Sequence, residues 1–184
     1  MEMTAEELLE RYAAGERDFR WESFEGVDLT GVKLPGINLN GARFSNCIMK
    51  NMDLTNSDLS ELRSEGTDWL GSNLSGANLY YVYISFCSFR EVNFEGADFR
   101  EGRFESVDFA GANLKKSLLI DTSFFECKFQ NAHFEESEVC SPDGFITIES
   151  AEDIRGAIGL ERIVCAREKH VYDDGSEVEA LILG

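Results

Sequence analysis

A large apolar residue recurs at every fifth position from Phe19 to Val139, with one exception at Ser64. The series covers 25 positions without a single insertion. An α-helix repeats every 3.6 residues and an ordinary strand every 2.0 residues, so neither element produces this period. A fixed period sustained over most of a chain indicates a solenoid, in which each turn packs only on its neighbours.

The other positions of the five-residue unit are also restricted. Two places before each large residue lies a small or apolar one, such as Ala42 or Val92, and the place between them usually holds Asp, Asn or another polar residue. Two places after the large residue, Gly or Asn is frequent, and both tolerate the backbone of a tight turn. Two inward and three outward positions per unit therefore predict a chain that coils around a narrow core.

Three of the units read Ala77-Asn78-Leu79, Ala97-Asp98-Phe99 and Ala112-Asn113-Leu114. This pattern resembles that of the pentapeptide-repeat family, which is abundant in cyanobacteria, and the resemblance extends over about residues 19–140. It implies a right-handed, four-sided β-helix in which four units form one 20-residue coil. Most members of the family have no known function, and a minority mimic duplex DNA and inhibit DNA gyrase.

The chain divides into three segments on this basis. Residues 1–18 are expected to form a helical N-terminal cap, in which Thr4 and Glu7 have the spacing of a capping box. Residues 19–140 are expected to form an all-β solenoid of about six coils, and residues 141–184 a mixed C-terminal cap. Such caps cover the unpaired backbone edges of the terminal coils.

The last segment departs from the five-residue pattern. Residues 145–149 are predicted to form a short strand, and residues 151–157 a helix. Beyond Leu160 two predictions remain open. The apolar spacing fits one face of a helix, but residues 162–172 and 177–183 also fit a hairpin around an Asp-Asp-Gly turn.

Three of the five cysteines, Cys47, Cys87 and Cys127, lie 40 residues apart at the small inward position. Coils spaced by about 4.8 Å would separate them by roughly 10 Å, which is too far for a disulfide or for shared metal ligation. We interpret them as small core residues. Whether Cys140 and Cys165 form a disulfide cannot be predicted from the sequence.

Ser64 is the only polar residue in the series of large ones. Two places earlier, Leu62 is unusually large for its position, so we predict that it fills the space that Ser64 leaves. The alternative is a functional notch at Ser64.

The chain carries 35 acidic and 17 basic residues, for a net charge of -18. This balance argues against direct binding of nucleic acid or of anionic membranes, both of which require Lys and Arg. The sequence has neither a membrane-spanning apolar run nor the features of a signal peptide, so we expect a cytoplasmic protein. No phosphate loop, metal-ligand cluster or nucleophile motif is present, and we expect no enzymatic activity and no cofactor.

The register assigns the acidic residues to faces of the coil. One face combines a single arginine, Arg100, with six carboxylates: Asp58, Glu61, Asp98, Glu101, Asp121 and Glu138. This face allows the hypothesis of a DNA mimic, since a duplex carries regularly spaced phosphates.

On and beside the same face, apolar side chains occupy outward positions: Tyr80, Tyr81, Tyr83, Phe86, Leu118, Ile120 and Phe125. An uncovered cluster of this kind is typical of a protein-binding surface, and the preferred hypothesis is a scaffold that binds an unknown protein partner as a monomer or weak dimer. The alternative is that the C-terminal segment folds back and covers the cluster.

Overall fold

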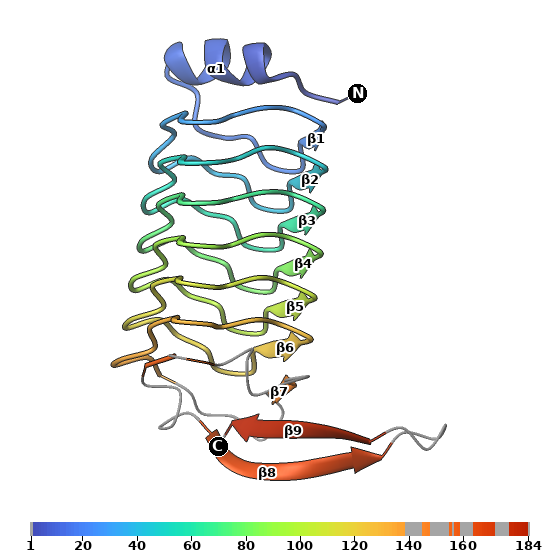
Figure 1. The fold of residues 1–184 in the computed structure, drawn as a ribbon. Helices are drawn as coiled ribbons and strands as arrows, with labels where there is room; N and C mark the ends of the chain where they lie inside the picture. The colour runs from blue at the N-terminus through green and yellow to red at the C-terminus, as the bar shows by residue number, and fades with distance from the viewer. Residues whose placement is uncertain are drawn as a thin grey trace.

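The computed structural model describes residues 2–138, 145–147, 155, 157–158, 164–171 and 177–183. The chain forms a stack of coils with a helix over one end and a hairpin at the other (Figure 1). The elements are α1 (Ala5–Ala13), β1 (Ser23–Glu25), β2 (Arg43–Ser45), β3 (Arg63–Glu65), β4 (Tyr83–Ser85), β5 (Arg103–Glu105), β6 (Ser123–Phe125), β7 (Phe145–Thr147), β8 (Val164–Val171) and β9 (Glu177–Leu183).

Strands β1 to β6 are parallel and in register at intervals of 20 residues, so that Ser23 pairs with Arg43 and Phe104 with Phe124. Five complete turns separate β1 from β6, and the chain follows the same path to Glu138. The other three sides of each coil are joined by single bridges, of which the pair formed by Asp28 and Ile48 is an example. The predicted β-solenoid with an N-terminal helix is therefore confirmed.

The large residues of the five-residue unit fill the centre of the stack. Towards the C-terminal end the core is a continuous series of phenylalanines, and consecutive rings from Phe89 to Phe109 have centroids 4.9 to 5.6 Å apart. Each of these rings is at most 1% exposed. Burying one such side chain stabilises the fold by about 1.5–3 kcal/mol, which makes the core the main source of stability.

The polar residue before each large one supports the turn that follows it. The Asp28 carboxylate accepts a hydrogen bond from the backbone N–H of Thr30 at 2.9 Å, and the Asn78 side-chain oxygen accepts one from Tyr80 at 3.0 Å. Asp and Asn are suited to this local bond because their side chains are short. Their recurrence in the repeat therefore has a structural cause.

The space beside Ser64 is occupied by Trp69, the next large residue of the series. Ser64 is only 2% exposed, and its Oγ accepts a hydrogen bond from the Trp69 indole N–H at 3.4 Å. The Trp69 ring also packs against Phe44 and Phe89, with centroids 5.9 and 5.7 Å away. The sequence predicts that Leu62 fills this space, whereas the residue that contacts Ser64 there is Trp69. The alternative of a functional notch is wrong because Ser64 is buried.

Helix α1 begins with the predicted cap, in which Thr4 Oγ1 accepts a hydrogen bond from the Glu7 N–H at 3.1 Å. The preceding residue, Met3, donates its N–H to the Ser23 carbonyl at 2.8 Å, so the chain pairs with β1 before the helix starts. Leu8 is fully buried beneath the helix. The helix therefore covers the first coil, as the sequence predicts.

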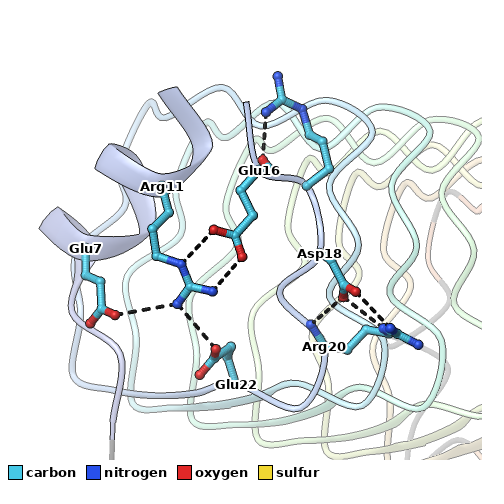
Figure 2. Close-up of polar contacts among 7 residues, drawn as sticks. Glu7, Arg11, Glu16, Asp18, Arg20 and Glu22 are labelled. Atoms are coloured by element: carbon cyan, nitrogen blue, oxygen red, sulfur yellow. Dashed lines mark hydrogen bonds and ion pairs between the residues drawn. The ribbon is translucent and has the colours of Figure 1, made fainter. Parts of the chain in front are cut away.

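Arg11 is one of the residues that connect α1 to the first coil (Figure 2). The Arg11 guanidinium binds both oxygens of the Glu16 carboxylate, at 2.6 and 2.9 Å, and lies 3.5 Å from a carboxylate oxygen of Glu22. It also lies over the Phe19 ring, 5.1 Å from the centroid. This hydrogen bonding lowers the pKa of Glu16 below its usual range.

Within the described residues, no helix has the length and apolar character to cross a membrane.

The C-terminal segment extends the sheet beyond β6. Strand β7 pairs with β6 in parallel through Phe124 and Ile146, and β9 pairs with β7 and β8 in antiparallel orientation. The strand predicted near residue 145 and the hairpin alternative are therefore confirmed.

Most of the predicted helix over residues 151–157 lies outside the described residues, within which Arg155 lies in a turn. The possible disulfide also lies outside, because Cys140 is not among the described residues.

Cys47, Cys87 and Cys127 are buried and free, as predicted. The Sγ of Cys127 lies 3.5 Å from the Phe104 carbonyl oxygen, to which it donates. Burial raises the pKa of all three thiols, and that of Cys127 reaches about 12.

The Cys127 thiol should make stability fall at alkaline pH. Because the folded pKa is raised, its contribution is complete below the ordinary thiol pKa and is lost as the pH rises from about 9 to about 12. We expect the urea midpoint to fall less between pH values of about 8 and 10.5 in Cys127→Ala than in the unsubstituted protein. An equal fall in both proteins would contradict this assignment.

Candidate binding surface

One coil carries aromatic side chains at four outward positions around β4. Tyr80, Tyr81, Tyr83 and Phe86 are 38%, 57%, 43% and 61% exposed, respectively. We call these four residues the aromatic band. Large aromatic side chains bury 150–250 Å² each when they are covered, so this band leaves a substantial apolar area in solvent.

Charged side chains flank the aromatic band on the coils above and below. Tyr83 pairs in the sheet with Arg63 on one side and with Arg103 on the other. In the column two residues earlier, the 20-residue register places Glu61 and Glu101 on either side of Tyr81. The band is therefore a single apolar row between two rows of alternating charge.

Two of the tyrosines are held in place by the next coil. The Tyr80 hydroxyl donates a hydrogen bond to Glu101 Oε1 at 2.9 Å, and the Tyr83 hydroxyl donates one to Glu105 Oε2 at 3.0 Å. These bonds to carboxylates raise the pKa of both hydroxyl groups. Within the described residues, the one ring contact of Tyr81 is with Tyr80, at 6.1 Å between centroids, and Phe86 has no ring contact. Tyr81 and Phe86 are therefore the most exposed rings of the aromatic band, and neither side chain has a hydrogen bond within the described residues.

The backbone of these two residues is in an unfavourable conformation. Tyr81 and Phe86 have φ values of 57° and 53°, in the left-handed region where Gly and Asn are preferred. Some equivalent turn positions, such as Asn51 and Gly76, carry those preferred residues, whereas others, such as Glu61 and Glu101, carry charged ones. The left-handed backbone is thus a regular feature of the repeat, and an aromatic residue there costs stability relative to Gly or Asn.

Replacing Phe86 with asparagine is expected to raise the free energy of unfolding by about 0.5–1 kcal/mol, because asparagine tolerates the left-handed backbone better. Urea unfolding followed by circular dichroism measures this change. Tyr83→Asn is the matched control, since Tyr83 belongs to β4 and has no positive φ. If Phe86→Asn destabilises the protein as much as the control does, the strain argument is wrong.

The remaining apolar residues of the predicted cluster lie on the coil that contains β6. Leu118, Ile120 and Phe125 are only partly exposed. The intervening coil places charged residues between them and the aromatic band; Glu105, for example, pairs with Phe125. The structure therefore does not bring the seven predicted residues into one continuous patch.

The described strands of the C-terminal segment do not cover the aromatic band. Strands β8 and β9 lie beyond β7 at the far end of the stack (Figure 1). The high exposure of Tyr81 and Phe86 is incompatible with the alternative that this segment folds back over them.

Trp21 is a further exposed aromatic residue that the sequence pattern did not single out; it is 64% exposed and has a φ of 63°. Its indole lies against Gly41 on the next coil, so closely that an added Cβ at Gly41 would clash with the ring. Between Trp21 and the aromatic band runs an open groove of about 300 Å³. Its lining includes Trp21, Arg43, Glu61, Arg63, Tyr81 and Tyr83. Trp21 lies two places after Phe19, at an outward position of the repeat, so the pattern could have identified it as exposed.

The carboxylates of the predicted acidic face have different environments. Asp58, Asp98 and Glu138 share one bridged column, as the register predicts. Asp58 accepts hydrogen bonds from both the N–H and the hydroxyl of Ser60. Partial burial opposes ionisation of Asp98, but hydrogen bonds from Arg100 outweigh it and lower its pKa. These two carboxylates therefore stabilise local turns.

The other carboxylates of that face are more accessible. Glu61, Glu101, Asp121 and Glu138 are all exposed, and Glu101 accepts the bond from Tyr80. Among the described residues, no group of three or more His, Cys, Asp or Glu side chains could hold a metal ion.

Comparison with known protein families gives a match over most of the coils. The model of the pentapeptide repeats matches in eight copies, over residues 23–60, 65–96, 87–124 and 103–138. The chain belongs to the pentapeptide repeat family. A search of curated proteins finds no match.

Several solved structures resemble this pentapeptide repeat protein. Full-length QnrB1, a plasmid-mediated fluoroquinolone resistance protein, is 17% identical, covering 76% of this chain and 95% of its own, with a TM-score of 0.42. A thylakoid-lumen protein of Arabidopsis thaliana is 20% identical over 58% of this chain and 63% of its own, with a TM-score of 0.31. HetL from Nostoc sp. strain PCC 7120 is 17% identical over 95% and 99%, with a TM-score of 0.23. At these identities and scores, the likeness says nothing about function.

Proposed function

We propose that this pentapeptide repeat protein is a non-enzymatic scaffold that binds another protein through the aromatic band. The observation that supports this most strongly is the position of Tyr81 and Phe86. Both are exposed, have few or no side-chain contacts and adopt a backbone conformation that disfavours aromatic residues. Stability does not explain exposed aromatic side chains at these turn positions, and burial against a partner protein would.

The composition of the surface fits this role. Tyr and Arg are enriched among residues that dominate binding energy, and a polar rim around them excludes water from the contact. Tyr80 and Tyr83 are already oriented by Glu101 and Glu105, so a partner would not have to order them. We expect the protein to act in the cytoplasm as a monomer or weak dimer.

The DNA-mimic alternative stays a prediction, and the exposed carboxylates of the acidic face favour it. Asp58 and Asp98 on the acidic face are engaged in local hydrogen bonds, and the same face carries Arg100 and the aromatic Tyr80. A mimic requires an unbroken row of accessible anionic groups.

Affinity capture from a native cell lysate tests the proposal. The immobilised protein is compared with a Tyr81→Asn, Phe86→Asn variant and with Ile48→Asn, which removes an exposed apolar side chain from a different face. We expect a protein that the unsubstituted chain and Ile48→Asn both retain, and that the double variant retains about tenfold less. Equal retention by all three proteins, or no retention by any, would contradict the proposed function.

A further inference from the structure

We propose that the groove beside the aromatic band binds an extended segment of the partner protein that carries one acidic side chain between two apolar ones. This inference rests on the proposed function and specifies the chemistry of the partner. It follows from the aromatic ends of the groove, from two arginines inside it and from the spacing of the coils.

The groove has an aromatic surface at each end. Trp21 lies at one end, and Tyr81 and Tyr83 lie at the other. Trp21 and Tyr81 occupy the same column of the repeat, 60 residues and therefore three coils apart. At about 4.8 Å per coil, the backbones of Trp21 and Tyr81 are about 14 Å apart, and the Trp21 indole extends over Gly41 towards Tyr81.

Arg43 and Arg63 lie between these ends on adjacent strands, where they pair directly in the sheet. Neither guanidinium has a hydrogen bond or an ion pair within the described residues, although Glu61 also lines the groove. The arginines Arg90 and Arg100, by contrast, both form ion pairs with aspartates. Two adjacent arginines without partners are unusual in a chain with twice as many acidic as basic residues.

The guanidinium group is planar and suited to bidentate binding of a carboxylate. Two neighbouring guanidinium groups also repel each other, and an anion placed against them relieves that repulsion. The groove is lined by three arginines, since Arg103 also belongs to it, and by Glu61 and Glu101. The two glutamates oppose a second negative charge, which favours a carboxylate over a doubly charged phosphate. The ligand group we infer is therefore an Asp or Glu side chain.

An extended peptide of five residues spans the coils from Trp21 to Tyr81. Its residues rise by about 3.3 Å each, and alternate side chains point to the same face, so residues i and i+4 are about 13 Å apart on one side. Residue i+2 then faces the groove between them, where Arg43 and Arg63 lie. The predicted partner segment is apolar at i and i+4 and acidic at i+2.

Fluorescence anisotropy with a designed peptide tests this inference. The probe is fluorescein-labelled Gly-Ser-Leu-Ser-Glu-Ser-Leu-Ser-Gly, and the matched peptide has Lys in place of Glu. We expect the Glu peptide to bind at least about tenfold tighter than the Lys peptide. An Arg43→Glu, Arg63→Glu variant should reverse this preference, because the charge inside the groove is reversed.

The control variant is Lys33→Glu, Lys128→Glu, which makes the same change in net charge on other faces of the coil. It should keep the preference for the Glu peptide, and circular dichroism should show that both variants fold. Equal binding of the two peptides, tighter binding of the Lys peptide, or no binding of either at about 1 mM would overturn the inference. If the captured partner depends on Tyr81 and Phe86 but not on the two arginines, the proposed function stands and only this inference fails.

Discussion

Replacing Phe109 with alanine is expected to lower the free energy of unfolding by about 3–5 kcal/mol. Phe109 is fully buried, and its ring packs against five other phenylalanine rings on three successive coils. The nearest of these, Phe129, lies 5.2 Å away between centroids. Removing the ring would leave a cavity that the stacked coils cannot close, because parallel strands on both sides fix the coil spacing.

Urea unfolding followed by far-ultraviolet circular dichroism measures this loss. Phe125→Ala is the matched control, because Phe125 is the same residue type at an outward, partly exposed position one coil away. The control should cost less than about half as much, since less apolar area leaves water at that site. A similar loss in both variants would show that the phenylalanine core is not the main source of stability.

Introducing phenylalanine at Ser64 is expected to destabilise the protein by about 2–3 kcal/mol, although a large apolar residue is what the repeat has at that position elsewhere. Phe44 and Ile84 pair directly with Ser64 on the neighbouring strands, but the space between them is taken by the Trp69 indole. A ring at position 64 would have to displace that indole from its contacts with Phe44 and Phe89.

The double variant Ser64→Phe, Trp69→Leu separates overpacking from any other cost. Leucine is smaller than tryptophan and leaves room for the new ring. The free energy of unfolding of the double variant should therefore be at least about 1 kcal/mol higher than that of Ser64→Phe alone. Ser64→Ala controls for loss of the indole hydrogen bond and should cost about 1 kcal/mol or less. A stabilising effect of Ser64→Phe would mean that the indole does not occupy this space.

The sequence predicts the coil architecture well because each position of the five-residue unit has its own physical requirement. The buried large residue, the Asp or Asn that accepts the turn N–H and the Gly or Asn at positive φ recur together, as at Asn78, Leu79 and Gly76. The unbroken register then assigns every residue a direction. For this reason the outward positions of Tyr81 and Phe86 could be read from the sequence alone.

Other features depend on contacts that the register does not specify. The compensation at Ser64 comes from Trp69, five residues later and on the next side of the coil, because core side chains from different sides meet in the centre. The indole of Trp21 lies over Gly41 because that residue lacks a side chain, which requires knowledge of the stacking of two coils. The choice between helix and hairpin near residue 164 is likewise decided by pairing of β9 with β7.

Site-specific photo-crosslinking at position 86 tests most directly whether the aromatic band is a protein-binding surface. A benzophenone amino acid replaces Phe86 in one variant and Ile48, exposed on another face, in a second, and both are irradiated in native cell lysate. We predict a defined protein cross-linked from position 86 and absent from position 48. Identical cross-linked proteins at both positions, or none at position 86, would contradict the account.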